Sequence, residues 1–171
     1  MRRTLDAVYN AAGYLAALFL VSTLLMVLSG IADRLLPFRL IRGADAYAGY
    51  SMAACAFLAL AYTLKHNEHI RVTLILQSVP AGARRALEIW SLTAASLLAA
   101  LFAYYSVRLA WQSHSFHDMS TMIDASPLWI PQLGMATGTL ILAIAFVDDL
   151  VMELRGLRRP VETRSEPVRS E

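Results

Sequence analysis

Blocks of uncharged, mostly apolar residues alternate with short charged segments along the whole chain. Four of these blocks contain no Asp, Glu, Lys or Arg, and each holds between 19 and 26 residues. A helix needs about 20 residues to cross the hydrocarbon core of a bilayer, so each block can cross it once. The pattern predicts an all-α integral membrane domain over residues 1–155. Its four transmembrane helices are expected at about 8–31, 46–64, 89–107 and 127–147.

The overall composition indicates the same class of protein. The chain is 57% hydrophobic and 16% charged, with a mean hydropathy of +0.50, which is more apolar than a water-soluble domain requires. The first block is longer than the apolar part of a secretory signal, so we predict that it is retained as a helix. The single cysteine, Cys55, excludes an internal disulfide. A net charge of +2 with scattered basic residues argues against nucleic acid as a partner.

The connection between the second and third blocks, residues 65–88, combines charged residues with an apolar run. It carries too many charges to cross the bilayer, yet Ile, Val and Leu dominate its middle part. We therefore predict an amphipathic segment that lies along the cytoplasmic face of the membrane, in contact with lipid. The residues expected to fix its depth or to contact a partner are Lys65, Glu68, His69 and Arg71.

The distribution of positive charge predicts the orientation of the helices. Eleven of the fifteen Lys and Arg residues lie at the N-terminus, in residues 65–88 or after the fourth block, and four lie in the other two connections. Short cytoplasmic segments retain the excess of positive charge, so both termini are expected in the cytoplasm. The tail, residues 156–171, has two prolines, mixed charge and no aromatic residue, and we predict that it is disordered.

The fourth block has a recognisable beginning. Ser126 is suited to cap the helix, and Pro127 fits the first helical position, where no backbone N–H is needed. Trp129 is expected at the level of the lipid headgroups. Pro131 is expected to mark a kink or a second start of the helix.

The predicted spans carry rows of small residues and no polar group at the bilayer midplane. None contains a charged residue or a histidine, and such groups or broken helices usually form ion and solute paths. This chain alone is therefore not expected to form a transport path. Rows of small residues let helix backbones approach closely. They consist of Ser91, Ala95, Ala99 and Ala103 in the third span and of Gly134 and Gly138 in the fourth. These rows either pack the four helices on one another or dock a second membrane subunit.

Candidate catalytic and metal-binding groups are sparse. The sequence shows no nucleophile with an adjacent base, no phosphate-binding glycine loop and no catalytic carboxylate pair, so an enzyme is not expected. All four histidines lie outside the predicted spans, and we expect neither a metal nor a cofactor at them. One alternative is a membrane anchor of a redox enzyme that holds haem or quinone. Its only candidate ligands are His66, His69, His114 and His117. A self-associating protein without a transport role is a further alternative.

Three acidic residues, Asp148, Asp149 and Glu153, follow the fourth span. The helix macrodipole disfavours negative charge at a C-terminus, so we expect Lys65 or Arg155 to offset these carboxylates. Contact with a basic patch on a partner is the other interpretation.

Two short motifs resemble one family of membrane proteins. The first is His69-Ile70-Arg71-Val72 in the amphipathic segment, followed by Thr73 where the family often has Asp. The second is SPLWIPQLG, residues 126–134, which is similar to the proline and tryptophan segment that opens the family's last helix. With its length and four-span layout, the chain up to its tail resembles the small, DctQ-like membrane subunit of tripartite ATP-independent periplasmic (TRAP) transporters.

The resemblance implies a location in the bacterial inner membrane and two protein partners. One partner is a large multi-span permease that carries the sodium and substrate sites, and the other is a soluble periplasmic protein that captures the solute. The small subunit would brace the fixed scaffold while the large subunit moves its substrate domain. Uptake of an organic acid would then be driven by the sodium gradient.

Overall fold

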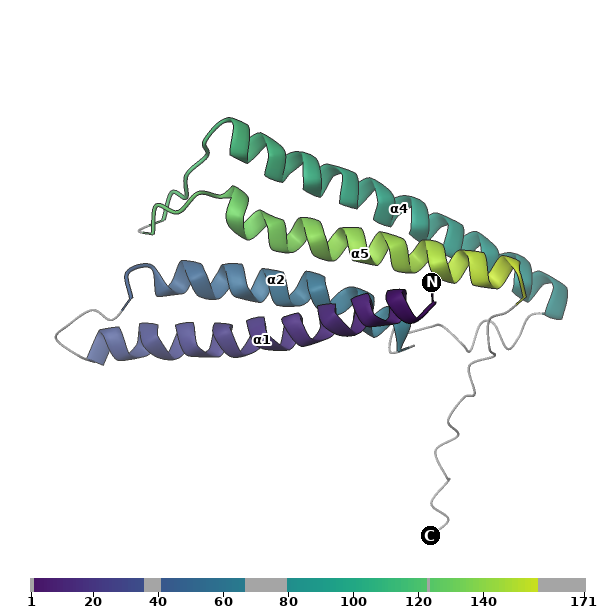
Figure 1. Cartoon of the computed structure of the whole chain (residues 1–171), viewed down its shortest axis with the longest axis horizontal. Helices are drawn as coiled ribbons and strands as arrows, with labels where there is room; N and C mark the ends of the chain where they lie inside the picture. Colours follow the sequence, from purple (N-terminus) through teal and green to yellow (C-terminus); the bar gives the residue numbers. More distant parts are fainter. Residues whose placement is uncertain (1, 36–40, 67–79, 123, 157–171) are drawn as a thin grey trace, which may run out of the picture.

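The computed structural model describes residues 2–35, 41–66, 80–122 and 124–156. In these parts the regular structure is helical, apart from one isolated antiparallel bridge between Met119 and Pro127. The helices are α1 (Arg2–Leu35), α2 (Ala44–Lys65), α4 (Ala81–Ser115) and α5 (Trp129–Leu154) (Figure 1). All four are long and apolar enough to cross a bilayer. The prediction of an all-α membrane protein with four transmembrane helices is confirmed.

Two predicted segments lie largely outside the described residues. One is the amphipathic segment, of which 67–79 are not described, including Glu68, His69 and Arg71. The other is the tail, of which 157–171 are not described. The last part of the predicted segment, from Ala81 onward, forms the first turns of α4 and continues into the third span without a break.

Helices α1 and α4 are longer than the bilayer requires. They contain 34 and 35 residues, which corresponds to about 50 Å of helix against about 30 Å of hydrocarbon. Two exposed tryptophans on α4, Trp90 and Trp111, are 21 residues apart, a rise of about 31 Å. This is the spacing expected for aromatic residues at the two membrane boundaries. Helix α4 continues past Val107, and Arg108 lies within it, one turn before Trp111.

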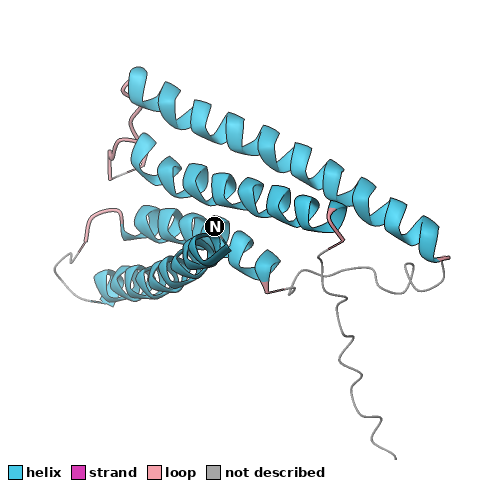
Figure 2. Ribbon diagram, turned by 45° about the vertical axis from the view of Figure 1, so that its right-hand side comes forward, coloured by secondary structure: helices cyan, strands magenta, loops and turns pink. Residues whose placement is uncertain are grey.

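The four helices form a single layer in the order α1, α2, α5, α4 (Figure 1). Each helix packs on the next one in this order, and α1 touches α5 only over a short stretch. The inner helices α2 and α5 run in the same direction, whereas α1 and α4 run in the opposite one. Helix α1 is also inclined to the other three (Figure 2). The start of α1 and the end of α5 lie at one end of the layer, here called the proximal end, and the opposite end is the distal end.

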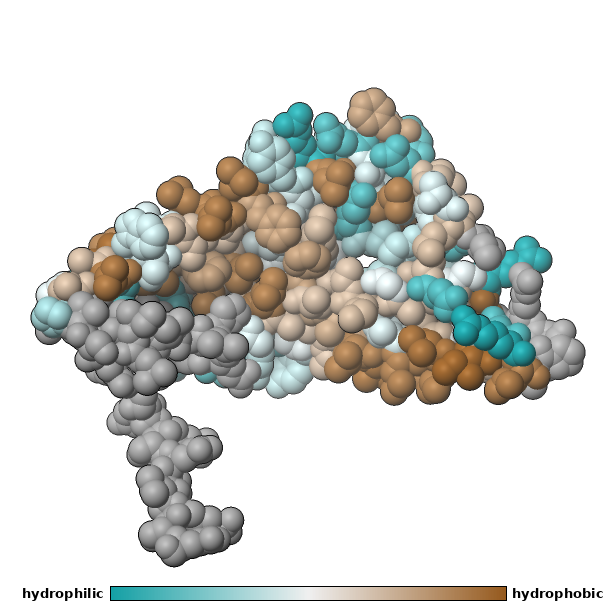
Figure 3. Space-filling model, turned by 180° about the vertical axis from the view of Figure 1, so that it is seen from behind, coloured by the Kyte–Doolittle hydropathy of each residue, from teal (hydrophilic) through white to brown (hydrophobic). Residues whose placement is uncertain are grey.

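Small residues form the interior of this layer. Thirteen of the eighteen buried hydrophobic residues in the described parts are alanines. The largest fully buried side chain is Tyr9 of α1, which clusters with Ala61 and Leu64 of α2 and with Leu142 of α5. Large apolar side chains lie outside instead, and Figure 3 shows them as a hydrophobic band over α1 at the lower edge. Surrounding lipid explains this distribution, because it solvates large apolar side chains while small ones let helix backbones approach.

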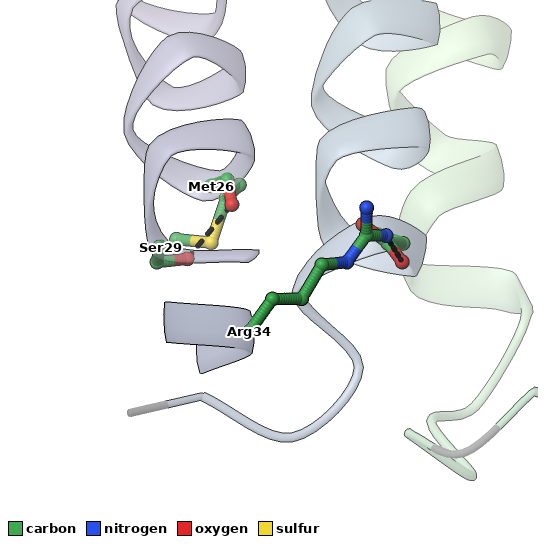
Figure 4. A network of polar contacts seen from close by, with 4 residues as sticks. Met26, Ser29 and Arg34 are labelled. Atoms are coloured by element: carbon green, nitrogen blue, oxygen red, sulfur yellow. Dashed lines mark hydrogen bonds and ion pairs between the residues drawn. The ribbon is translucent and has the colours of Figure 1, made fainter. Parts of the chain in front are cut away.

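At the distal end, Arg34 of α1 extends toward the first turn of α2 (Figure 4). Its guanidinium lies 3.7 Å from the carboxylate of Asp45, and both side chains are 76% exposed. An exposed pair of this kind contributes at most about 1 kcal/mol. Ser29 Oγ donates to the carbonyl oxygen of Met26 at 2.7 Å, so this hydroxyl is satisfied within α1. Helix packing therefore contributes more than these polar contacts to the pairing of α1 and α2.

Candidate functional site

Gly134 and Gly138 bring α5 into close contact with α2. A Cβ added at Gly134 would lie 2.8 Å from Cβ of Ala54, and one added at Gly138 would lie 2.6 Å from the carbonyl carbon of Phe57. Carbon atoms in a close-packed interior stay farther apart, so any side chain at Gly138 would push the two helices apart. The glycine pair therefore lies in a contact between two helices of this chain.

The predicted row of small residues on α4 faces α5 only in part. Ala99 and Ala103 are buried and cluster with Ala143 of α5, whereas Ser91 is exposed and Ala95 is half-buried. Four residues turn about 400° around an α-helix, which is about 40° more than one full turn. A row of residues spaced by four therefore winds around α4 and moves off the side that faces α5. The buried side of α4 advances by alternating steps of three and four residues. It consists of Leu92, Ser96, Ala99, Ala103, Ser106, Ala110 and Ser113. This spacing is typical of two helices that wind around each other.

Trp129 and Pro131 lie in the first turn of α5. Trp129 is half-buried and contacts His114 of α4 edge to face, with ring centroids 5.3 Å apart. Pro131 occupies a position whose N–H would have no acceptor within the helix, so α5 continues through it. The prediction of Ser126 as the N-cap is wrong, because α5 begins after Leu128 without a side-chain cap. The hydroxyl of Ser126 donates to Asp124 instead.

Asp124 fastens the connection between α4 and α5 to the start of α2. Its carboxylate accepts hydrogen bonds from Ser126 Oγ and from Ser120 Oγ at 2.9 Å. Tyr50 Oη of α2 donates to Ser120 Oγ at 3.0 Å and lies 3.4 Å from the Asp124 carboxylate, so it reaches Asp124 mainly through Ser120. Gly43, with φ +78°, packs beneath it, because an added Cβ would lie 2.8 Å from Cβ of Asp124. The hydrogen bond from Ser126 lowers the pKa of the Asp124 carboxyl; burial opposes this shift and Ser120 adds to it.

The sequence analysis did not identify this polar cluster. Ser120, Asp124 and Ser126 are close together in the sequence and were a local signal, but Tyr50 is 74 residues away from Asp124. The same connection contains two non-glycine residues in left-handed conformation, His117 (φ 54°) and Ala125 (φ 45°). Each costs about 1–2 kcal/mol relative to an ordinary backbone conformation. The hydrogen bonds to Asp124 therefore hold a connection that would otherwise relax.

Lys65 and Asp148 join the inner helices at the proximal end. Lys65 Nζ lies 2.9 Å from Asp148 Oδ2, and the two side chains are 22% and 21% exposed. The same ammonium group lies 5.3 Å from the ring centre of Tyr9 of α1. The prediction that Lys65 offsets the acidic residues after the fourth span is confirmed for Asp148. Because both groups are largely shielded from water, removing one of them would leave a poorly solvated charge, at a cost of about 1–3 kcal/mol.

The described histidines lie at opposite ends of the layer. His66 follows α2 at the proximal end, where its ring stacks on Tyr62 at 4.0 Å. His114 lies in the last turn of α4 and His117 follows the helix, both at the distal end. Among the described residues, which do not include His69, no three His, Cys, Asp or Glu side chains are grouped to hold a metal. His66 therefore cannot share a haem with His114 or His117, and none of the described histidines lies in the middle part of a helix, where a haem bound within the bundle would need its axial ligands.

Comparison with known proteins identifies the family. A family model described as tripartite ATP-independent periplasmic transporters, DctQ component, matches residues 23–156, which is more than three quarters of the chain. A search of curated proteins finds no match. The matched region contains all of α2, α4 and α5 and the second part of α1. The resemblance inferred from the two sequence motifs is confirmed. The chain therefore belongs to the DctQ family, the small membrane subunits of tripartite ATP-independent periplasmic transporters.

Proposed function

We propose that this chain is the scaffold subunit of a sodium-driven organic acid transporter and that the exposed face of α2 docks the large permease subunit. The family is a component of a transporter that also has a large permease and a periplasmic binding protein, and it is not a family of enzymes. The described helices carry acidic residues near their ends and none in their middle parts. The proposal therefore assigns the sodium and substrate sites to the large subunit.

The observation that carries the proposal is the uncovered face of α2. This inner helix packs against α1 on one side and α5 on another, yet Gly49, Met52, Ala53 and Ala56 are exposed. Their spacing places them on one side of the helix, and a Cβ added at Gly49 would meet nothing within 4 Å. Three of the four are small, and rows of small residues in membranes occur where another helix approaches closely. A helix of the large subunit fits this face.

The bracing role is supported by the way α2 and α5 are joined at both ends. At the proximal end the contact is the ion pair of Lys65 with Asp148, and toward the distal end Gly134 of α5 packs on Ala54 of α2. Between them, Gly138 allows the two backbones to touch. Two inner helices fixed at three levels resist sliding, which a fixed support for a moving domain requires.

The proposal includes the orientation of the layer and a role for the segment after α2. The proximal end, which holds most of the positive charge, faces the cytoplasm. Lys65, Glu68, His69 and Arg71 then anchor the segment at the cytoplasmic boundary or contact the large subunit. In a variant lacking Cys55, a cysteine at Ser115 should react with an impermeant reagent in intact cells, and one at Ala83 should not. The opposite result would contradict the orientation.

Reconstitution tests the transport role. The three proteins in vesicles should take up a labelled organic acid only with an inward sodium gradient, and omission of this chain should abolish uptake. Ala53→Phe should lower recovery of the large subunit on the tagged small subunit about tenfold, because a tenfold loss requires only 1.4 kcal/mol of lost contact. Leu25→Phe, on the outer side of α1 where Leu25 is 58% exposed, is the matched control and should change neither recovery nor uptake.

Two results would contradict the proposal, each in a different part. Normal recovery and uptake with Ala53→Phe would show that this face of α2 lies in lipid. Uptake that proceeds equally well without a sodium gradient would show that another gradient or energy source drives the transporter.

A further inference from the structure

A groove runs between α4 and α5 in the distal half of the layer, and its volume is about 350 Å³. Its deeper part is lined by apolar side chains such as Val107, Leu133 and Leu140. Its mouth is lined by Trp111 and His114 of α4 and by Trp129 of α5. The groove thus changes from apolar to amphipathic toward the membrane boundary at the distal end.

The length of the groove corresponds to one leaflet of the bilayer. From Trp129 at the mouth to Leu140 the chain advances eleven residues along α5, which is about 16 Å of helix. Half of the hydrocarbon core is about 15 Å. A transmembrane helix of a partner would need a groove about twice as long, whereas a lipid acyl chain needs only this depth.

Arg108 of α4 is not one of the lining residues of the groove, but it lies one turn from Trp111 at the mouth. Arg108 follows Val107 directly and lies three residues before Trp111, so its side chain neighbours that of Trp111 on the surface of α4. Arg108 is exposed, and within the described part of the chain no acidic residue pairs with it. An unpaired arginine one turn inside the aromatic level extends toward the headgroups, where phosphate is the anion available to it.

We propose that this groove binds one phospholipid of the leaflet at the distal end. One acyl chain lies in the groove from Trp129 toward Leu140. The phosphate lies at the mouth, where Arg108 and the imidazole of His114 are its hydrogen-bond partners and the two tryptophans flank the glycerol region. The site uses α4 and α5, so it does not depend on docking of the large subunit at α2.

Native mass spectrometry of the full chain in detergent, titrated with phosphatidylglycerol, tests the site. The wild type should retain one lipid per chain. Thr137→Phe, at an exposed position in the lining, should fill the groove and reduce retention to background. Ile144→Phe, on the same helix outside the lining, should leave retention unchanged.

Arg108→Gln should lower retention of the lipid about fivefold, because one cation near lipid phosphate contributes about 1 kcal/mol. Arg85→Gln, on α4 at the proximal end, is the control for loss of charge.

Two further ligands separate the parts of the proposed site. Diacylglycerol with the same acyl chains should bind about fivefold more weakly, because it lacks the phosphate. Inorganic phosphate should not displace the phospholipid, because it has no chain to fill the groove. Equal binding of diacylglycerol, displacement by inorganic phosphate, or unchanged retention in Thr137→Phe would each overturn the proposal.

A fluorescence experiment tests the site without changing any residue of the groove, so its result does not depend on whether Thr137→Phe folds. In Trp90→Phe the remaining tryptophans are the two at the mouth, Trp111 and Trp129. Phosphatidylglycerol with brominated chains should quench their emission and saturate at one lipid per chain. Quenching that rises in proportion to lipid without saturation would show ordinary solvation by lipid and would overturn the proposal.

Discussion

The neighbouring helices α1 and α2 differ in the size of the side chains that they expose. Helix α1 exposes many large side chains, with Leu18 at 65% and Leu24 at 57%, whereas the open face of α2 carries the small residues Gly49, Ala53 and Ala56 beside one large residue, Met52. Both helices are apolar enough to span a bilayer. Hydropathy alone therefore identifies the spans but not what covers them. Lipid solvates large apolar side chains well, so α1 is suited to lipid, while the small residues of α2 are suited to another helix.

The largest loss of stability is expected from a bulky side chain at Gly138, where α5 touches α2. Gly138→Leu should destabilise the chain by about 3 kcal/mol or more, because the new side chain would overlap the backbone at Phe57. Thermal unfolding of the purified subunit in detergent, followed by circular dichroism, measures this. The control is Gly82→Leu, since an added Cβ there meets nothing within 4 Å. Equal melting temperatures for both variants would contradict the close contact of α5 with α2.

Gly49→Leu should have the opposite pattern to Gly138→Leu. The isolated subunit should unfold at the wild-type temperature, because no atom lies within 4 Å of the added Cβ. Recovery of the large subunit should nevertheless fall about tenfold, since the leucine would occupy the space of the partner helix. If Gly49→Leu unfolds early, the face is part of the subunit's own packing and the comparison of α1 with α2 fails.

A smaller effect is expected when one charge of the proximal ion pair is removed. Lys65→Met should cost about 1–3 kcal/mol, because Asp148 would remain partly shielded without its partner. The double variant Lys65→Met with Asp148→Leu should recover most of this loss. Arg34→Met breaks the exposed pair with Asp45 and should cost less than about 1 kcal/mol. Equal losses in the free energy of unfolding for Lys65→Met and Arg34→Met would show that shielding the proximal ion pair from water has no energetic effect.

The smallest change in melting temperature is expected from removing the charge of Asp124 at the distal end. The folded protein lowers the pKa of Asp124 below its usual 3.8, so ionised Asp124 stabilises the fold above that pH. This contribution is lost as the pH falls below 3.8 through the lowered pKa. Asp124→Asn should therefore lower the melting temperature slightly at pH 6, and the difference from wild type should shrink at pH 3. Asp45→Asn is the exposed control. A difference that stays constant with pH would mean that the charge of Asp124 does not stabilise the connection.

The sequence predicted the properties that depend on local composition. The four spans follow from uncharged blocks, and Gly134 and Gly138 were recognised because small residues four apart share a helix face. On α4 the predicted row of small residues with a step of four overlaps the buried row at Ala99 and Ala103, but the buried row itself follows alternating steps of three and four, which the sequence analysis did not predict. The order of helices in the layer and the contact of Tyr50 with Asp124 depend on which distant faces meet. Lipid surrounds every helix, so hydropathy does not distinguish these faces.

The central claim, that the open face of α2 docks the large subunit, can be tested most directly by crosslinking in cells. A photoreactive amino acid in place of Met52, the large exposed side chain on the open face of α2, should crosslink this chain to the large permease subunit, whereas the same residue in place of Leu18 on α1 should crosslink only to lipid. Crosslinking of the large permease from position 18 and not from position 52 would contradict the account, because the lipid-facing and partner-facing helices would then be exchanged.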